Sequence, residues 1–321
     1  MITKRSLAIT RARVKSLIRR PILRTYQLEG IHDGTPLRVL IAEDGSSLDY
    51  LRAVMFPRGA DLKPVGAVPA IAAHRLVIAD QDIVAVGANR FLLPLYSRKF
   101  HLAPKWMRLY LSPIDHPDAM IALLHGNAGN AVRKNVRKMK AEDFSSEVTN
   151  DPVWFDRFYH EMYIPYARQR FRELIAVDTY DRLRGVFEHG FGMILRLGGR
   201  EAGGALLFPR GDDLWFHRMG TVDGDQTLNK EGFSTALYYE MILLAHERGY
   251  KGMDFGHCRP FASDGVLRYK LKWGMRVVDE DDSVADFALA APGPTEAGRQ
   301  FFKQNPFYEF TKEGIRLCDE P

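Results

Sequence analysis

The order of short strands and helices between residues 191 and 278 constrains the fold most strongly. Two runs of strand-forming residues flank the glycine-rich segment GGREAGG, which predicts a β-hairpin, and helical spacing of apolar residues follows. The predicted elements are strands Phe191–Leu197, Ala205–Pro209 and Asp213–Gly220, helix Gly232–Arg248, strand Gly252–Phe255, helix Ser263–Trp273 and strand Met275–Val278. This β-β-β-α-β-α-β order predicts a mixed sheet with helices packed on it.

The preceding half of the chain is less regular. Its 321 residues exceed what one hydrophobic core usually holds, so two domains are expected. The sequence predicts short strands at Leu37–Ala42, Leu76–Ala79, Ile83–Val86 and Trp106–Leu111, and helices at Ser47–Phe56, His116–Met139 and Asp151–Phe171. Pro165 is expected to kink or split the last of these helices.

The positive charge is concentrated at the N-terminus. Residues 1–24 hold eight basic side chains and no acidic one, whereas the net charge of the whole chain is only +5. Leu7, Val14, Leu17 and Ile18 can share one helical face, so the arm is suited to an anionic membrane surface or to a phosphate backbone such as that of tRNA. A solvated arm without a partner is the alternative.

Cysteine usage and hydropathy predict where the protein works. Cys258 and Cys318 are the only cysteines, and no N-terminal segment resembles a signal peptide, which favours a reducing, cytoplasmic setting. No apolar run reaches the roughly 20 residues of a spanning helix, so membrane contact at the inner face is expected to be peripheral, through the basic arm. His257 and Cys258 lack a second ligand pair at zinc spacing, and no metal site is therefore predicted.

Lys270 lies at an unusual position in the segment MDFGHCRPFASDGVLRYKLKWG. It follows Val266 by four residues and Leu267 by three, so helical spacing places its ammonium on the apolar side, toward the strand that carries Asp254. There it can meet Asp254 or His257, or stabilise a developing oxyanion or a phosphate. A lysine stem that only covers apolar surface, and an aspartate that only forms a turn, are the alternatives.

Histidines near these strands are candidates for proton transfer, because their ordinary pKa lies near neutral pH. The candidate catalytic residues are Lys270, Asp254, His257 and His217. The sequence does not choose among the last three as the proton acceptor. Basic and aromatic residues near the same elements are the candidate substrate contacts, namely Arg218, Arg259, Tyr269, Arg133 and Arg137.

The turn before the helix Gly232–Arg248 is a candidate binding loop for an acyl donor. A polar loop delivers the backbone N–H groups of NKEGFST to a helix N-terminus, which suits an anion such as a pyrophosphate. The candidate donor-binding residues are Asn229, Lys230, Gly232, Phe233 and Ser234. A glycine and a serine that merely begin a helix are the alternative.

Two longer stretches resemble a known family. The run Leu237–Val277, which contains Gly265-Val-Leu-Arg-Tyr-Lys270-Leu-Lys-Trp-Gly274, is similar to the C-terminal signature of the FemAB-like branch of the GNAT acyltransferase superfamily. AVRKNVRKMKAEDF, residues 131–144, resembles the basic inter-domain helix end of that branch. Asn229–Ser234 is a degenerate variant of the loop by which GNAT enzymes hold coenzyme A. The resemblance covers residues 115 to 285 approximately.

The resemblance implies a fold and a division of the chain. It implies an α/β (α+β) protein with tandem GNAT-like domains, each a mixed, mostly antiparallel sheet flanked by helices, with a degenerate N-terminal lobe. The expected parts are a basic arm at 1–24, a degenerate domain with the inter-domain helix at 25–140, and an acyltransferase domain at 141–321.

The resemblance also implies transfer of an acyl or aminoacyl group to an amine of a cell-envelope precursor, a peptide or a small metabolite. The donor is acyl-CoA or aminoacyl-tRNA used as a co-substrate, with no permanently bound cofactor, and Lys270 assists the reaction. The chain lacks the helical-hairpin insertion of some tRNA-using members, so both donors stay open. A non-catalytic module of the same fold that binds nucleic acid or anionic membrane is the alternative function.

Overall fold

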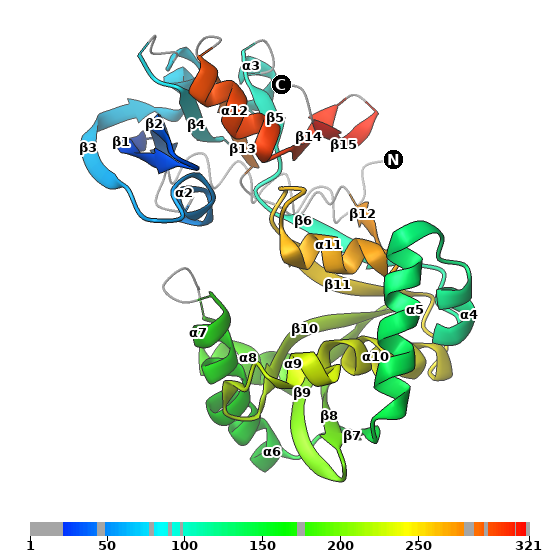
Figure 1. The fold of residues 1–321 in the computed structure, drawn as a ribbon. Coiled ribbons are helices and arrows are strands. Elements are labelled where there is room, and N and C mark those ends of the chain that lie inside the picture. Colours follow the sequence, from blue (N-terminus) through cyan, green and yellow to red (C-terminus); the bar gives the residue numbers. More distant parts are fainter. Residues whose placement is uncertain are drawn as a thin grey trace, which may run out of the picture. The chain divides into compact units, whose positions relative to one another are not determined.

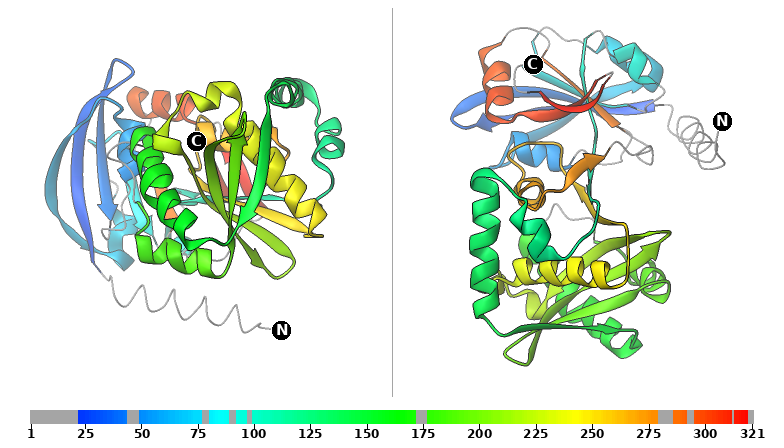
Figure 2. Two further views of the ribbon diagram at one scale, coloured as in Figure 1. Left: turned by 90° about the horizontal axis from the view of Figure 1, so that it is seen from below. Right: turned by 90° about the vertical axis from the view of Figure 1, so that its right-hand side faces the viewer.

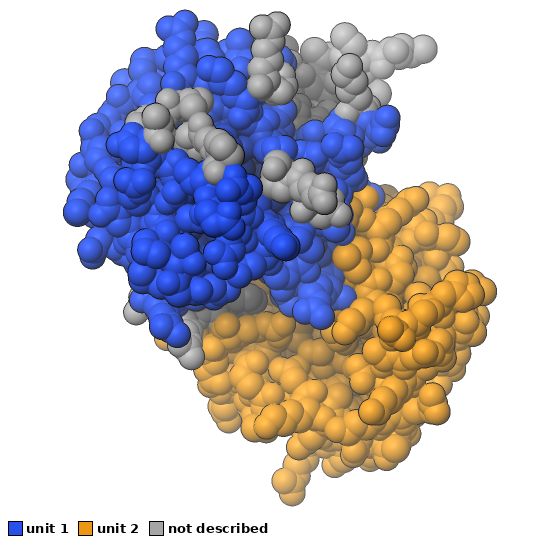
Figure 3. Space-filling view, turned by 45° about the horizontal axis from the view of Figure 1, so that its top comes forward, with its two compact units in different colours: residues 1–107, 258–268, 278–321 blue, residues 108–257, 269–277 orange. Residues whose placement is uncertain are grey.

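The computed structural model describes residues 22–43, 49–76, 80–88, 92–96, 99–171, 177–278, 286–291, 295–311 and 313–318. The chain forms two compact units (Figure 3). Unit 1 comprises residues 1–107, 258–268 and 278–321, and unit 2 comprises 108–257 and 269–277. The units differ from the predicted ranges 25–140 and 141–321, because a strand at 286–290 and the C-terminal hairpin pack with the N-terminal half of the chain.

Unit 1 is built on a six-stranded sheet with the order β3-β1-β2-β4-β13-β5. All neighbouring pairs whose register is defined are antiparallel except β2 with β4. Its strands are β1 (Ile22–His32), β2 (Thr35–Glu43), β3 (Asp61–Pro69), β4 (Ile83–Ala88), β5 (His101–Ala103) and β13 (Asp286–Ala290), with a separate hairpin of β14 (Phe307–Thr311) and β15 (Gly314–Cys318). Its helices are α2 (Asp49–Met55), a 3-10 turn at Ala70–Arg75, α3 (Leu93–Tyr96) and α12 (Glu296–Gln304).

Both faces of the sheet in unit 1 are buried at its centre. Along β2, Val39 and Ile41 belong to one apolar cluster, and Leu40 and Ala42 belong to the cluster on the opposite face. A continuous apolar run is what a strand covered on both sides requires, since successive side chains point to opposite faces.

Unit 2 is built on a seven-stranded sheet with the order β12-β6-β11-β10-β9-β8-β7. Its strands are β6 (Met107–Leu111), β7 (Phe144–Thr149), β8 (Phe191–Leu197), β9 (Arg200–Arg210), β10 (Asp213–Thr221), β11 (Gly252–Cys258) and β12 (Arg276–Val278). Its helices are α4 (Pro117–Ala122), α5 (Gly126–Ala141), α6 (Pro152–Arg157), a π-helical turn at Phe158–Tyr163, α7 (Ile164–Phe171), α8 (Tyr180–Glu188), a 3-10 turn at Val222–Gly224, α9 (Leu228–Glu231) and α10 (Phe233–Glu247). Helix α11 (Gly265–Lys272) is divided, with residues 265–268 in unit 1 and 269–272 in unit 2. The hairpin β8–β9 and the third strand β10 confirm the predicted order (Figure 1).

Two helical predictions in unit 2 need adjustment. The helix expected over His116–Met139 is two helices, because His125 is extended before α5 and Gly126, its first residue, adopts a left-handed conformation (φ 64°). The helix expected over Asp151–Phe171 is divided by the π-helical turn, after which Pro165 occupies the second position of α7. The backbone stays helical through Ile164, so Pro165 removes one backbone donor from a continuous helical segment directly after the π-helical turn.

The two sheets repeat one arrangement. In the sheet of unit 1, the antiparallel strands β1 and β2 lie beside β4, which runs parallel to β2. In the sheet of unit 2, the antiparallel strands β9 and β10 lie beside β11, which runs parallel to β10. The connection from β2 to β4 contains α2, the edge strand β3 and a 3-10 turn, whereas the connection from β10 to β11 is helical, and further helices cover the sheets (Figure 2). The predicted tandem of mixed, mostly antiparallel sheets flanked by helices is confirmed.

Membrane contact was predicted for the basic arm 1–24, of which residues 1–21 lie outside the described residues. Residues 22–24 are the first residues of β1. Among the described residues, no helix is both long enough and apolar enough to cross a bilayer. Peripheral contact through the arm stays a prediction.

A close approach between β10 and the π-helical turn allows a test of the packing in unit 2. A Cβ added at Gly220 would lie 2.5 Å from the carbonyl carbon of Met162 and 2.6 Å from the backbone nitrogen of Tyr163. We expect Gly220→Ala to lower the free energy of unfolding by about 1–3 kcal/mol, because backbone atoms must shift to accept the methyl group. Urea denaturation measures the change.

Gly185→Ala is the matched control for this prediction. Gly185 lies inside α8, and its added Cβ would meet nothing within 4 Å. Alanine there should raise stability by up to about 1 kcal/mol. Equal effects of the two substitutions would contradict the close approach at Gly220.

Candidate functional site

The parallel pair of unit 2 formed by β10 and β11 ends early. The two strands pair at Asp213 with Gly252, Leu214 with Met253 and Trp215 with Asp254. Both strands then continue, β10 to Thr221 and β11 to Cys258, without further pairing to each other (Figure 1). The carboxyl ends of neighbouring parallel strands are the usual binding position in α/β sheets, so this divergence locates the candidate site.

His217 is the extra residue of a β-bulge in β10. Phe216 pairs with Leu207 of β9 and Arg218 pairs with Leu206, which leaves His217 without a residue opposite it. A bulge bends its strand and redirects a side chain, and bulges are frequent beside active sites. The bulge follows directly after the last pair with β11, so it contributes to the divergence of the two strands.

The surroundings of His217 keep its imidazole neutral. Burial, and then the charge of Arg218, lower its pKa from 6.5 to about 4, although Asp178 opposes this shift. Its Nε2 is buried and has no hydrogen-bond partner among the described residues. A buried, unpaired ring nitrogen is costly, and such groups are often reserved for a ligand or a reaction. His217 can therefore accept a proton at neutral pH.

His257 lies near the end of β11, close enough to His217 for the two rings to interact electrostatically. Burial by surrounding protein atoms is the largest cause of its lowered pKa, whereas the carboxylate of Asp254 raises it. The side chain nevertheless keeps more than a third of its surface exposed, so solvent weakens these effects. His257 is therefore a secondary candidate for proton transfer.

Asp254 forms a buried ion pair with Arg108 of β6. Only 1% of the surface of Asp254 and 5% of that of Arg108 is exposed, and the guanidinium carbon lies 4.3 Å from the ring centre of Trp215. The second carboxylate oxygen of Asp254 accepts a hydrogen bond of 2.6 Å from the N–H of Gly256. With both oxygens engaged, these contacts favour a structural role for Asp254.

Lys270 is buried, as its helical spacing predicted. Its exposed fraction is 3%, and its Nζ donates to the backbone oxygens of Gly256 (3.3 Å) and His257 (3.2 Å). These carbonyls are presented to the lysine because Gly256 adopts a left-handed conformation (φ 71°), which bends the end of β11. Lys270 thus brings a positive charge to the end of the strand beside His257.

The predicted donor loop forms the short helix α9 and the start of α10. Gly232 has a left-handed φ of 108° and caps α10 without a side-chain hydrogen bond. The hydroxyl of Ser234 donates to Oδ1 of Asn229 at 2.6 Å, and Lys138 of α5 donates to the backbone oxygen of Lys230. The side chain of Phe233 is fully buried, so only its backbone can face a ligand.

The predicted substrate contacts occupy different places. Arg218 lies beside His217, pairs with Asp178 and donates to the backbone oxygen of His217 at 2.7 Å. Tyr269 is half-buried and its hydroxyl lies 3.4 Å from that of Thr235 in the first turn of α10. Arg259 belongs to unit 1, whereas the other candidates belong to unit 2.

The two arginines predicted on α5 are not gathered at the histidines. Arg133 donates to the backbone oxygens of Ile121 and Leu124 at the end of α4, at 3.2 and 2.7 Å, and therefore holds α4 against α5. Arg137 is exposed on α5. Their roles in substrate binding stay predictions.

Sequence reasoning missed Asp178 and Arg182. Asp178 is buried before α8 and pairs with both Arg218 and Arg182, the latter at 3.0 Å. Asp178 opposes and Arg182 reinforces the lowered pKa of His217. No local pattern connects Asp178 with β10, about 40 residues later, so only the folded chain reveals this group.

Comparison with known proteins gives structural matches only. No family model matches the sequence, and no curated relative was found. The structural matches include FemX, with a TM-score of 0.44 and 11% identity over 82% of this chain and 83% of that chain. A tandem GNAT protein from the clavulanic acid biosynthesis pathway matches with a TM-score of 0.36 and 12% identity over 89% of each chain. L-PGS from Bacillus licheniformis matches with a TM-score of 0.42 and 12% identity over 68% of this chain and 71% of that chain.

The low pKa of His217 predicts a contribution to the pH dependence of stability. Between pH 6.5 and about pH 4, His217 binds a proton in the unfolded state but not in the folded state. Its contribution to the free energy of unfolding is therefore complete above pH 6.5 and is lost as the pH falls toward 4. We expect His217→Gln to reduce the loss of stability between about pH 7 and about pH 5. Urea unfolding at the two pH values measures it.

His189→Gln is the control, because His189 is exposed at the end of α8. This substitution should leave the difference between the two pH values close to that of the unmodified protein. If His217→Gln has no more effect than His189→Gln, His217 is not held neutral by the fold.

Proposed function

We propose that unit 2 catalyses the transfer of an acyl or aminoacyl group to an amine, with His217 as the proton acceptor. The observation that supports this most directly is the neutral, half-buried histidine, with a buried and unpaired Nε2, on a bulge where two parallel strands separate. A general base with a pKa at or below the working pH is in its proton-accepting form.

The divergence of β10 and β11 supports a position for the acyl donor. Beyond Trp215, the edge of β10 that faces β11 no longer takes part in the ladder between them. An extended ligand with amide groups can pair with such a strand edge. Its reactive carbonyl would then lie near the bulge, where backbone N–H groups of β10 can stabilise the developing oxyanion.

The start of α10 supports a position for the anionic part of the donor. α10 is a helix of 15 residues, and its cap Gly232 supplies no side chain to its first N–H groups. A helix N-terminus of this kind attracts phosphate. Coenzyme A and aminoacyl-tRNA both carry phosphates, so both remain proposed donors, and the degenerate loop sequence Asn229–Ser234 does not select one.

The proposed reaction moves one proton from the acceptor amine to the leaving group. The amine nitrogen attacks the carbonyl carbon of the thioester or ester, and His217 takes the proton that the nitrogen loses. The C–S or C–O bond then breaks, and the proton passes to the departing thiolate or alkoxide. Lys270 holds the bent end of β11 through two carbonyls and adds positive potential beside the oxyanion.

The acceptor is proposed as an amine of a cell-envelope precursor, a peptide or a small metabolite, as the sequence resemblance implies. The buried carboxylate of Asp178 and the more exposed arginines Arg182 and Arg218 form a charged network near His217. It supplies fixed charge close to the base, which suits an acceptor with both an amine and an anionic group. The basic arm is proposed to bring the protein to anionic lipid or tRNA.

A transfer assay tests this function with two defined donors. The full chain is incubated with labelled acetyl-coenzyme A or with tRNA charged with a labelled amino acid, each with an extract of small molecules and lipids as the source of acceptors. We expect label in an amide product that survives mild alkali, which hydrolyses esters and thioesters. His217→Gln should reduce the rate by about 10²–10⁴, the usual contribution of a general base.

His189→Gln serves again as the matched control and should retain the rate. A His217→Gln protein that transfers at the unmodified rate would show that His217 is not the base. If neither donor gives an amide product, the proposal of acyl transfer fails, and the non-catalytic binding module becomes the better interpretation.

A further inference from the structure

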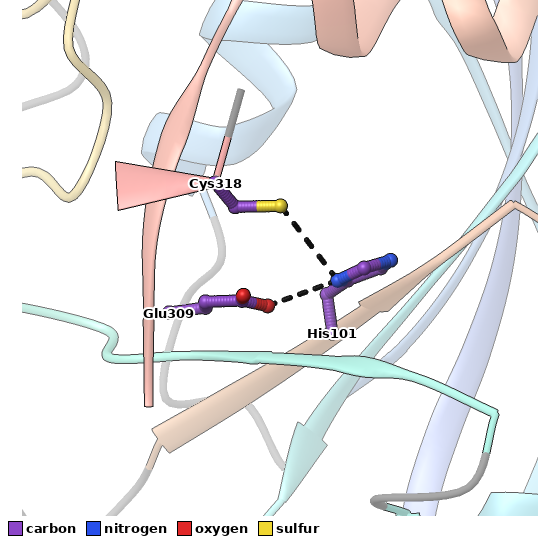
Figure 4. Close-up of side chains that lie close together, drawn as sticks. All are labelled: His101, Glu309 and Cys318. Carbon is purple, nitrogen blue, oxygen red and sulfur yellow. Dashed lines mark hydrogen bonds and ion pairs between the residues drawn. The ribbon is translucent and has the colours of Figure 1, made fainter. Parts of the chain in front are cut away.

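Three side chains with metal-binding atoms converge in unit 1, whereas the site described above is formed by residues of unit 2. Glu309 lies on β14, Cys318 on β15 and His101 on β5 (Figure 4). In the β14–β15 hairpin, Glu309 pairs with Arg316 and Phe307 pairs with Cys318. Paired residues share a face of a hairpin, and so do residues two positions apart, so Glu309 and Cys318 are diagonal neighbours on one face.

The ligand atoms of these residues are close together. Nδ1 of His101 lies 2.9 Å from Oε2 of Glu309 and 3.8 Å from Sγ of Cys318, and the three atoms all lie within 4.8 Å of one another. Zinc bonds of about 2.0–2.3 Å in a tetrahedral arrangement place neighbouring ligand atoms about 3.3–3.7 Å apart. Shifts of less than about 1 Å in these atoms therefore bring all three to a common zinc ion.

Burial and neighbouring contacts orient the three groups. Glu309 is 7% exposed and Cys318 6% exposed, and Cys318 belongs to the apolar cluster that also holds Phe307 and Ala103. Oε1 of Glu309 accepts two hydrogen bonds from Arg316, at 3.0 and 3.1 Å, which directs Oε2 toward His101. The side chain of His101 is 35% exposed, so solvent can reach this side of the cluster.

We propose that His101, Glu309 and Cys318 form a zinc site, with water as the fourth ligand. Imidazole, carboxylate and thiolate are the three ligand types that zinc uses in proteins, and three protein ligands with one open position is a recognised arrangement. On binding, the thiol of Cys318 releases its proton to solvent and its sulfur becomes a thiolate ligand. Arg316 serves as the outer partner that holds the carboxylate.

An ion pair between His101 and Glu309 explains two of the three residues. It does not explain why the chain also directs a thiol from β15 to the same imidazole nitrogen. The positive charge of Arg316 opposes a dication, but its side chain is 67% exposed and solvent screens it. A zinc ion uses all three groups at once.

Cobalt substitution tests the site in the full-length protein. Protein treated with a chelator and then freed of it is titrated with Co²⁺, whose complexes with thiolate show an intense near-ultraviolet charge-transfer band. We expect this band to saturate at one ion per chain, and to disappear when Zn²⁺ is added, since zinc binds such sites more tightly than cobalt. Competition with a chromophoric zinc chelator then gives the affinity.

The two cysteines provide a matched pair of variants. Cys318→Ala should abolish the charge-transfer band and lower zinc affinity at least about 100-fold, because loss of even an outer-shell partner often costs 10–100-fold. Cys258→Ala should retain the charge-transfer band and the zinc affinity. Cys258 is also buried, but its Sγ contacts the backbone oxygen of Met107. His101→Gln removes a second ligand from a partly exposed position and should also lower the affinity.

Circular dichroism shows whether each variant is folded. The absence of a saturable band in the unmodified protein would overturn the proposal. So would a band that Cys258→Ala removes and Cys318→Ala retains. If Cys318→Ala does not fold, unchanged zinc affinity in folded His101→Gln would also overturn it.

Discussion

The buried ion pair between Arg108 and Asp254 is the interaction on which the site in unit 2 depends. It joins the neighbouring strands β6 and β11 directly beside Trp215, the last residue of β10 that pairs with β11. Burying two charges is costly, and removal of either partner from such a pair typically costs about 3–5 kcal/mol. The carboxylate also accepts the N–H of Gly256, so the same pair fixes the bend at the end of β11.

The bend at the end of β11 explains how Lys270 can be buried, although burial of an unpaired ammonium costs free energy. The carbonyls of Gly256 and His257 are turned toward α11, where the ammonium of Lys270 receives them in place of water. His257 is thereby held near His217, whose pKa is lowered by burial and by Arg218. These hydrogen bonds satisfy the carboxylate of Asp254 and the ammonium of Lys270, which would otherwise be buried without partners, whereas Nε2 of His217 stays unpaired.

The two sheets differ at their parallel strand pairs, which is why we propose a reaction site in unit 2 alone. In unit 1 the parallel strands β2 and β4 pair from Val39 with Ile83 to Ala42 with Val86, and these apolar side chains are buried on both faces. In unit 2 the corresponding pair ends after three residue pairs and is followed by the bulge at His217. This difference agrees with the predicted degenerate N-terminal lobe.

The sequence predicts what local patterns encode. Strand alternation and glycine turns locate β8, β9 and β10, and helical spacing predicts that Lys270 is buried. Contacts between distant segments have no local signal. Arg108 meets Asp254 across 146 positions, and His101 meets Glu309 across 208, so neither the ion pair nor the proposed zinc ligands follow from spacing, and no metal site was predicted.

The structure of a complex with a non-reactive donor tests the central claim most directly. The probes are a thioether analogue of acetyl-coenzyme A and a stable amide analogue of the aminoacylated tRNA end. We predict that one of them lies along β10 beyond Trp215, with its carbonyl or equivalent atom near His217 and its phosphate at the start of α10. A donor bound on another surface, with His217 still covered by protein, would contradict this prediction.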